Sequence, residues 1–298
     1  MNLLRSAATV GGMTGISRVL GFVRDVMIAA SLGTGAIADA YFVAFRFPNL
    51  FRRLFAEGAF NSAFIPLFAG RLEAEGKDAA RKFGSEALSI LFWILLVFTG
   101  MAELAMPWLM KLLAPGFLED PAKFDLAVVL TQIAFPYLLL MSLTALLSGV
   151  LNSLGKFAVA AAAPIVLNVV LILTLGAITF LGWAGSVAAG HALVWGVSIA
   201  GALQLLMVYL AAKKAGMALQ FGWPRITPGV KRLAILGVPG VIAGGVTQIN
   251  IMVGTIIASL QDGAVSFLYY ADRVYQLPLG IVGVAIGVVL LPDLTRRL

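Results

Sequence analysis

Long apolar stretches alternate with short polar or glycine-containing breaks along almost the whole chain. A helix needs about 20 mostly apolar residues to cross the hydrocarbon core of a bilayer. Eight stretches of spanning length are predicted to be transmembrane helices, and they lie near residues 10–32, 37–68, 84–110, 126–151, 158–181, 184–211, 232–259 and 265–291. The pattern therefore predicts an all-α polytopic membrane protein.

The composition supports this class and argues against several others. Of the 298 residues, 61% are hydrophobic and only 12% are charged, which is about half the charged share of an ordinary soluble domain. The chain has no cysteine, so disulfides, thiolate catalysis and Cys-ligated metals are excluded. The single histidine, His191, cannot form a metal site alone and is expected to have a hydrogen-bonded packing role. Without an Asp-x-x-x-Asp box or a second histidine, a membrane enzyme is not favoured, and no metal or cofactor is expected.

Lysine and arginine gather in alternate loops. Thirteen of them fall on one side of the predicted helices, most densely at 70–84 and 213–232, whereas the opposite loops hold only Lys111 and Lys123. Because basic residues collect on the cytoplasmic side of a membrane, both termini of this chain are predicted to be cytoplasmic. The basic loops are interpreted as topology signals and as contacts with lipid headgroups, not as a nucleic-acid surface.

Six arginines remain, and all fall inside predicted helices: Arg18, Arg24, Arg46, Arg52, Arg53 and Arg273. An arginine at the centre of a lipid-facing helix costs about 2.5–3.5 kcal/mol. These side chains are therefore expected to face a watery cavity, a protein partner or, by snorkelling, the membrane interface. Polar amides in the predicted helices are expected to hydrogen-bond across helices; they are Gln132, Asn168, Gln248 and Asn250.

The second predicted helix has one polar face. Residues with the spacing of a shared helical face are Arg46, Asn49, Arg53 and Glu57. Asp39 joins this face from its N-terminal side, and Arg52 lies off its edge. Because the segment exceeds 30 residues, it is too long to cross straight, and a bend or a tilt is expected.

Fewer acids than arginines are predicted to be buried; they are Asp25, Asp39, Glu57 and Asp272. Six arginines against four acids leave a net charge of about +2. One interpretation is that internal salt bridges lock the helices together, with Asp272–Arg273 and Arg53–Glu57 as candidates. The other is an inward-facing cationic pocket for an anionic substrate, most naturally a phosphate or pyrophosphate, because the planar guanidinium group binds phosphate oxygens bidentately.

An internal repeat organises the chain. The segment ASLGTGAIADAYFVAFR at 30–46 resembles ASLQDGAVSFLYYADR at 258–273, and with a one-residue gap Arg46 falls on Arg273. The period of about 228 residues encloses six predicted helices, and an even number per repeat gives parallel halves.

The repeat predicts two lobes. Residues 1–215 would form a six-helix N-terminal lobe, residues 216–231 a cytoplasmic linker, and residues 232–298 the first two helices of a second lobe. About four helices of the second lobe would then be absent, so the chain is expected to be part of a longer protein.

Several motifs are similar to those of one transporter family. The strings GISRVLGFVRDVMIA, ADAYFVAFRFPNLFRRLFAEGAFNSAFIPLF, APGF, FPYLLL and YYADRVYQLPLGIVGVAIGVVLLP resemble the MurJ (MviN) family of lipid II flippases, in the multidrug/oligosaccharidyl-lipid/polysaccharide exporter superfamily. The resemblance extends over essentially all of the chain. A complete member would have 14 transmembrane helices, of which this chain would hold about the N-terminal 60%.

The resemblance implies a bacterial inner-membrane transporter, not an enzyme, that flips undecaprenyl-pyrophosphate-linked peptidoglycan precursor to the outer leaflet by alternating access. It implies that the pyrophosphate is bound by Arg18, Arg24, Arg52 and Arg273. Asp39 resembles the family's gate acid, and further cavity or gate residues would be Asp25, Arg46, Asn49, Arg53, Glu57 and Asp272. Membrane lipids and cell-wall synthesis proteins are the implied partners. An exporter of another substrate from the same superfamily, a polysaccharide-lipid or a drug, is the alternative.

Overall fold

The computed structural model describes residues 3–53 and 61–276, and every regular element in these two ranges is a helix. Glu57 and most of the eighth predicted helix lie outside them. The labelled elements are α1 (Leu3–Leu32), α2 (Ala36–Arg52), α3 (Asn61–Ala74), α4 (Gly76–Leu104), α5 (Met106–Leu113), η2 (Pro115–Glu119), α6 (Pro121–Ala134), α7 (Tyr137–Ser153), α8 (Phe157–Phe180), α9 (Val187–Lys214) and α10 (Pro228–Ser259). A further helix covers residues 264–276.

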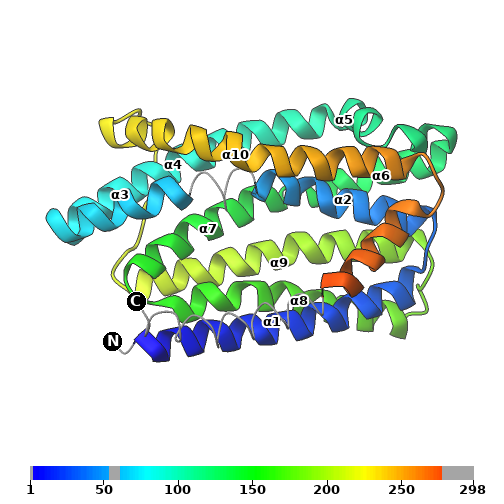
Figure 1. The fold of residues 1–298 in the computed structure, drawn as a ribbon, viewed down its shortest axis with the longest axis horizontal. Coiled ribbons are helices and arrows are strands. Elements are labelled where there is room, and N and C mark those ends of the chain that lie inside the picture. Colours follow the sequence, from blue (N-terminus) through cyan, green and yellow to red (C-terminus); the bar gives the residue numbers. More distant parts are fainter. Residues whose placement is uncertain (1–2, 54–60, 277–298) are drawn as a thin grey trace, which may run out of the picture.

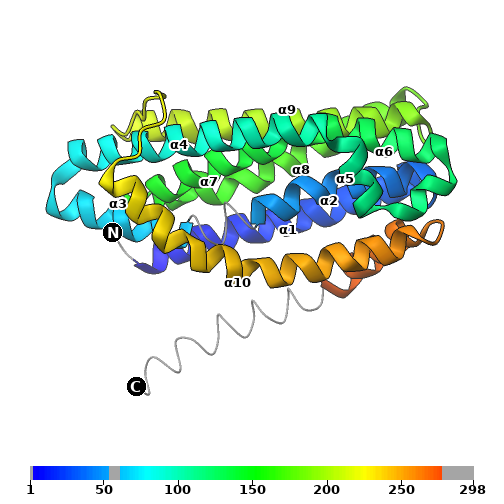
Figure 2. The same ribbon diagram turned by 90° about the horizontal axis from the view of Figure 1, so that it is seen from above.

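The helices α1 to α9 form a bundle, in which α8 lies between α1 and α9 (Figure 1). In the view from above, α10 runs along one side of this bundle (Figure 2), where it contacts α2, α3, α4, α5 and η2. A short turn then leads into the helix over 264–276, which packs back onto α1 and α2 through Tyr269. We call residues 228–276 the α10 hairpin. The candidate site lies where this hairpin contacts the bundle.

Polar caps and prolines fix where the later helices begin. The Asp120 side chain accepts hydrogen bonds from the backbone N–H groups of Ala122 and Lys123, and Pro121 opens α6. Thr227 caps α10 in the same way, because its hydroxyl accepts from the N–H of Val230. The Asp120 cap also fixes the turn from which the Lys123 side chain projects.

The prediction of a loop over residues 70–84 is wrong, because helices cover almost all of this range. α3 continues to Ala74 and α4 begins at Gly76, so the two helices meet at a turn in which Gly76 has a φ of 85°. Residues 70–84 are rich in Ala, Glu, Lys and Arg, which are strong helix formers. Both helices therefore extend past the apolar stretches of the sequence. The basic residues Lys77, Arg81 and Lys82 therefore lie on the first turns of α4.

The bundle has two ends of different charge. The turn between α3 and α4, the turn between α7 and α8 and the segment from α9 to α10 lie at one end, which we call the basic end (Figure 1). The α1–α2 turn, η2, the α8–α9 turn and residues 260–263 lie at the opposite end, which we call the latch end (Figures 1 and 2). The thirteen loop and terminal basic residues predicted for one side include Lys156, Lys213 and Lys214 at the basic end.

Several helices are suited to a membrane by length and composition. In the described part of the chain, α4, the joined α6–α7 segment, α8 and α9 qualify, and α10 adds a fifth span if its two halves, bent by 52°, count as one. α2 is only 17 residues long, and α1 carries Arg18, Arg24 and Asp25. The helices that qualify carry their charges mainly near their ends, whereas α1 has charged residues along its length. The count of eight spans and the division into lobes stay predictions.

The segment before α10 is fastened to α4. The backbone N–H groups of Gln220 and Gly222 donate to the hydroxyls of Ser85 and Ser89, and the rings of Trp93 and Trp223 stack at 5.3 Å. These contacts fix the point at which the chain enters the α10 hairpin.

Candidate functional site

Arg24 and Asp25 form a buried ion pair on α1. Each residue is 6% exposed, and Arg24 donates from Nε and Nη2 to Asp25 Oδ1 at 2.9 and 2.6 Å. Arg24 Nη1 also donates to Asn168 Oδ1 on α8 at 2.8 Å, and Asn168 Nδ2 donates to the Ser17 carbonyl. The interhelical bonding predicted for Asn168 is confirmed, and it holds the Arg24 guanidinium in one orientation.

A second arginine approaches Asp25 from the α10 hairpin. Arg273 Nε lies 3.2 Å from Asp25 Oδ2, and Arg273 Nη2 donates to the Tyr269 hydroxyl at 3.1 Å. That hydroxyl also lies 3.4 Å from Asp25 Oδ1. The Nε atom of Arg273 is buried, yet within the two described ranges it has no aligned hydrogen-bond acceptor. One carboxylate is therefore shared by two arginines, and one guanidinium donor is left over.

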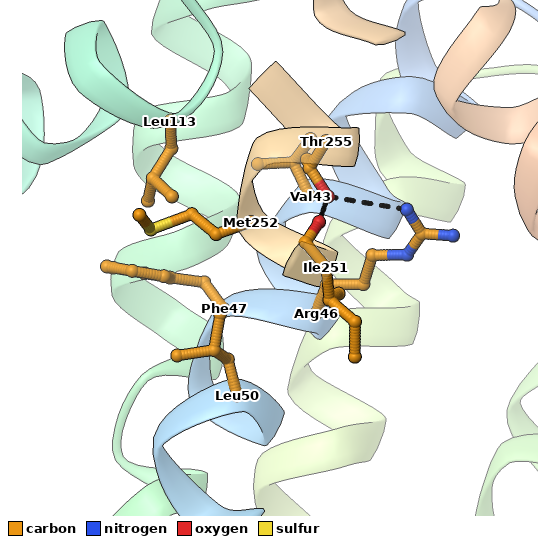
Figure 3. Close-up of a pocket in the computed structure, with 8 residues that line it drawn as sticks. All are labelled: Val43, Arg46, Phe47, Leu50, Leu113, Ile251, Met252 and Thr255. Carbon is orange, nitrogen blue, oxygen red and sulfur yellow. Dashed lines mark hydrogen bonds between the residues drawn. The ribbon is translucent and has the colours of Figure 1, made fainter. Parts of the chain in front are cut away.

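Arg46 of α2 brings a third guanidinium to the same place. Its Cζ lies 5.5 Å from the centre of the Tyr269 ring, and that of Arg273 lies 4.8 Å from it. Arg46 also borders a small pocket between α2 and α10, where Nη1 is 3.5 Å from the Thr255 hydroxyl (Figure 3). Figure 3 shows apolar side chains, among them Phe47 and Met252, on the other side of this pocket.

We call this group the arginine cluster; it consists of Arg24, Asp25, Arg46, Tyr269 and Arg273. The cluster holds three guanidinium groups and one carboxylate, Asp25, which contacts Arg24 and Arg273 but not Arg46, so the cluster carries an excess of positive charge. Like charges repel strongly where water is largely excluded. An anion with several oxygens would relieve this repulsion and would suit the planar donors of arginine.

The second buried acid, Asp39, lies at the latch end and is fully buried. Its Oδ2 accepts from Lys123 Nζ at 2.9 Å and from the N–H of Gly263 at 3.0 Å, and its Oδ1 accepts from the N–H of Ser266 at 2.9 Å. Lys123 Nζ also donates to Asp262 Oδ1 at 3.1 Å. We call these residues the latch, because they join α2 and α6 to the turn at 260–263.

Further contacts surround the latch and the arginine cluster. The N–H of Gly116 in η2 donates to the Ser259 hydroxyl at 3.3 Å. The Tyr270 hydroxyl donates to the Gly33 carbonyl at 2.9 Å, and the ring of Tyr269 stacks on Phe42 at 3.9 Å. The two segments of the sequence repeat thus pack on each other, and they close the latch end.

The remaining predicted site residues are placed differently. Arg18 and Arg53 have exposed side chains. Arg52 is half-buried, and its Nε donates to Asn49 Oδ1 at 3.0 Å, while Asn49 donates to the Phe45 carbonyl. Glu57 lies outside the described residues, so the proposed Arg53–Glu57 pair does as well.

The predicted burial of Asp272 and its salt bridge to Arg273 are wrong. Asp272 is exposed, and its Oδ2 accepts from Gln276 Nε2 at 2.6 Å. The physical reason is that Asp272 lies on the outward face of its helix, whereas Arg273 is directed inward at Tyr269 and Asp25. Removing this pairing increases the excess of positive charge in the arginine cluster.

Lys123 belongs to the candidate site although the sequence places it among the loop charges of the less basic side. Its side chain is only 3% exposed and pairs with Asp39 and Asp262. Its place on the first turn of α6, three residues after the Asp120 cap, was the available signal. The sequence offers no signal that Tyr269, which lies within the repeat segment 258–273, contacts both Arg46 and Arg273.

Comparison with known proteins identifies the relatives of this chain. Residues 28–298 match the family model described as lipid II flippase MurJ. The chain is 54% identical to a probable lipid II flippase MurJ of Rhizobium tropici, over 100% of this chain and 56% of that protein. It is 40% identical to the lipid II flippase MurJ of Burkholderia cenocepacia, over 99% of this chain and 58% of that protein.

A solved structure also matches this fold. It is described as lipid II flippase MurJ in an inward closed conformation, with a TM-score of 0.75 and 26% identity over 96% of this chain and 58% of that chain. The chain therefore spans somewhat more than half the length of the proteins that it matches.

Proposed function

Since this chain belongs to the MurJ family of lipid II flippases, we propose that it serves to move a lipid-linked pyrophosphate from the inner to the outer leaflet of the bacterial cytoplasmic membrane. The substrate is the undecaprenyl-pyrophosphate-linked peptidoglycan precursor, lipid II. The protein acts as a transporter, and no bond in the substrate is broken.

The observation that carries this proposal is the excess of guanidinium groups in the arginine cluster. Arg24, Arg46 and Arg273 come from three separate helices, and Asp25 is the carboxylate among them. The buried Nε of Arg273 lies 3.2 Å from Asp25 Oδ2 without an aligned hydrogen bond in the described part of the chain, so a phosphate oxygen that enters the cluster would replace a poorly aligned contact. A diphosphate offers enough oxygens for several guanidinium donors at once.

The lipid tail requires an apolar surface beside the headgroup. α1 provides one, because exposed apolar side chains flank Arg24 along this helix; they are Ile16, Val19, Phe22, Val23 and Val26. In this proposal the diphosphate binds in the arginine cluster, and the prenyl chain stays in the membrane along the exposed face of α1. Only the headgroup then has to cross the bilayer within the protein.

The latch at Asp39 serves as the gate of one side in an alternating-access cycle. Closure buries Asp39 against the start of the helix over 264–276. Opening would separate the α10 hairpin from η2 and from the α1–α2 turn, which would expose the arginine cluster at the latch end. Arg18, Arg52 and Arg53 would meet the headgroup at other stages of the cycle.

The membrane orientation follows from the charge of the two ends. The basic end, with the N-terminus, lies in the cytoplasm, and the latch end, to which Lys111 of α5 and Lys123 of α6 belong, lies outside. Eight transmembrane helices, six of them in a first lobe, agree with this orientation. Membrane lipids contact the apolar helices, and cell-wall synthesis proteins are the expected protein partners.

An exporter of cationic drugs is the alternative within the same superfamily. Such a substrate would need a cavity in which acids outnumber arginines. The arginine cluster has the opposite balance, because it contains three arginines and one carboxylate. A lipid-linked polysaccharide would share the pyrophosphate chemistry and would differ only in its sugars.

The identity of the bound lipid tests the proposed function. The full-length protein would be purified in mild detergent, and its lipids would be extracted and identified by mass spectrometry. We expect polyprenyl diphosphate-linked sugars to copurify with the parent protein and to be depleted in the Arg273→Ala variant. Copurification of phospholipids alone, unchanged by this substitution, would overturn the proposal.

A further inference from the structure

Beyond the arginine cluster, we propose that Lys123 is a positioning residue for the gate. Its ammonium group, shared between Asp39 and Asp262, controls the closure of the latch end. This inference rests on the proposed transport function, because a gate matters only in a protein that alternates between two sides. It concerns a residue that no motif or comparison assigns.

Lys123 is placed for this role by the fold. The Asp120 cap and Pro121 fix the first turn of α6, and the Lys123 side chain runs from this turn into the protein, where it is 3% exposed. Its Nζ lies 4.4 Å from the centre of the Phe117 ring in η2. The ammonium group is therefore held among α2, η2 and the turn at 260–263.

Asp39 depends on partners from both sides of the gate. Lys123 belongs to the bundle, whereas Gly263 and Ser266, which donate their N–H groups to Asp39, belong to the α10 hairpin. The carboxylate lies at the positive end of the helix over 264–276, which favours a negative charge there. A buried carboxylate is costly without such compensation.

The latch changes its pairing when the gate moves. On opening, Asp39 would lose both backbone donors, and Lys123 would lose Asp262, because these partners leave with the α10 hairpin. Lys123 and Asp39 would stay together, because α6 and α2 are packed on each other in the bundle. Lys123 thus keeps Asp39 compensated in both states, and in the closed state it adds a direct bond to the α10 hairpin.

Cysteine labelling can measure this closure directly. The chain has no cysteine, and Ser259, 3% exposed and facing Gly116 across the closed gate, offers a conservative reporter position. The Ser259→Cys reporter would be placed in the full-length protein, in a background otherwise free of cysteine. A membrane-impermeant maleimide would be added to intact cells and, separately, to inverted vesicles.

We expect Lys123→Met to raise the labelling rate from outside at least tenfold, because the closed latch end loses its bond to Asp262 and leaves Asp39 undercompensated. The matched control is Lys111→Met, which removes a lysine from the same end where the side chain is exposed; its labelling rate should equal the parent's. An unchanged rate in Lys123→Met, with normal protein levels, would overturn the inference.

Two further variants keep the test decisive. Asp262→Asn changes a fully exposed carboxylate and leaves the packing of the protein intact, so it serves if Lys123→Met does not accumulate. We expect about twofold to threefold faster labelling. In a background of Asp39→Asn, Lys123→Met should add only the twofold to threefold effect of losing Asp262, because the rest of its effect acts through Asp39. Full additivity of the two substitutions, or no effect of Asp262→Asn, would contradict the role.

The labelling rate does not require substrate, so the inference and the proposed function can fail separately. Faster labelling in Lys123→Met together with normal transport in Arg24→Ala would support the gate and remove the substrate proposal. Unchanged labelling together with lost transport in Arg24→Ala would do the reverse.

Discussion

The two buried aspartates, Asp25 on α1 and Asp39 on α2, differ in the charge of the groups that surround them. Asp25 has two arginines in contact and belongs to a cluster with three. Asp39 has one lysine, itself shared with a second acid, and two backbone N–H groups. Positive charge is in excess around the first and balanced around the second.

This difference in charge balance suits the arginine cluster to binding a ligand and the latch to closing the gate. A group of cations that lacks enough partners within the protein can bind an anionic ligand, because the ligand completes the pairing. A carboxylate whose partners are all supplied by the protein gains nothing from a ligand, and its bonds instead hold two segments together. The arginine cluster is therefore suited to bind, and the latch is suited to open and close.

The largest effect is expected from the Arg24→Ala substitution in the full-length protein. It removes charge-assisted bonds to Asp25 and Asn168, each worth about 1.5–3 kcal/mol, and it removes one of three cluster cations. We expect transport of lipid II to fall by about 100-fold or more, with normal membrane insertion, in a flipping assay on spheroplasts. The exposed Arg81→Ala serves as control, and equal losses in the two variants would contradict a specific role.

Substitution of Gly116 should act on the latch end and leave the arginine cluster intact. A Cβ atom at this position would lie 2.0 Å from the Ser259 carbonyl oxygen and 2.6 Å from the Leu260 Cα. Because both atoms belong to the backbone, Gly116→Ala should prevent tight closure and raise maleimide labelling of the Ser259→Cys reporter about tenfold. Gly100→Ala, where a Cβ meets nothing within 4 Å, should leave labelling unchanged.

Neutralising each aspartate in turn tests the comparison itself. Asp25→Asn removes a negative charge beside the proposed binding site, and we expect inorganic pyrophosphate to bind about fivefold to tenfold more tightly. Asp39→Asn should give a smaller gain, which arises only from opening of the latch end, because its carboxylate bonds to the latch and not to the arginine cluster. Calorimetric titration of the full-length protein measures both, and an equal gain in the two variants would mean that the two sites are not distinct.

The Asn168→Asp substitution should make the arginine cluster more like the latch. It places a second carboxylate beside Arg24 with almost no change in size. We expect pyrophosphate affinity to fall about threefold, and thermal stability to fall slightly, because the donor to the Ser17 carbonyl is lost at a cost of about 1 kcal/mol. Asn168→Ala should lose the same bond with little loss of affinity, and this pair separates charge from packing.

The sequence alone predicts the helical class and the burial of Asp25 and Asp39, because long apolar stretches and isolated charges within them are local features. It does not reveal which charges meet. Asp25 and Arg273 are far apart in the chain, as are Asp39 and Lys123, and their pairing depends on how α6 and the α10 hairpin pack. Asp272 and Arg273, although adjacent, point in different directions.

The apolar pattern also misplaces helix boundaries. Helices continue wherever the chain keeps good helix formers, so α3 and α4 run through the basic stretch that a hydropathy pattern assigns to a loop. Lys123 is assigned to a loop for the same reason. α6 begins at Pro121, well before the apolar stretch that starts near residue 126. Polar first turns of helices are therefore places where functional charges are overlooked.

Binding of a short-chain polyprenyl diphosphate to the full-length protein tests the central claim most directly. Its affinity would be compared with that of the matching monophosphate, in the parent and in the Arg24→Ala and Arg273→Ala variants. We predict that the parent binds the diphosphate at least tenfold more tightly than the monophosphate, and that each variant loses this preference. Equal affinity for the two lipids in the parent, or a preference that survives both substitutions, would contradict a diphosphate site built from arginines that outnumber their carboxylate.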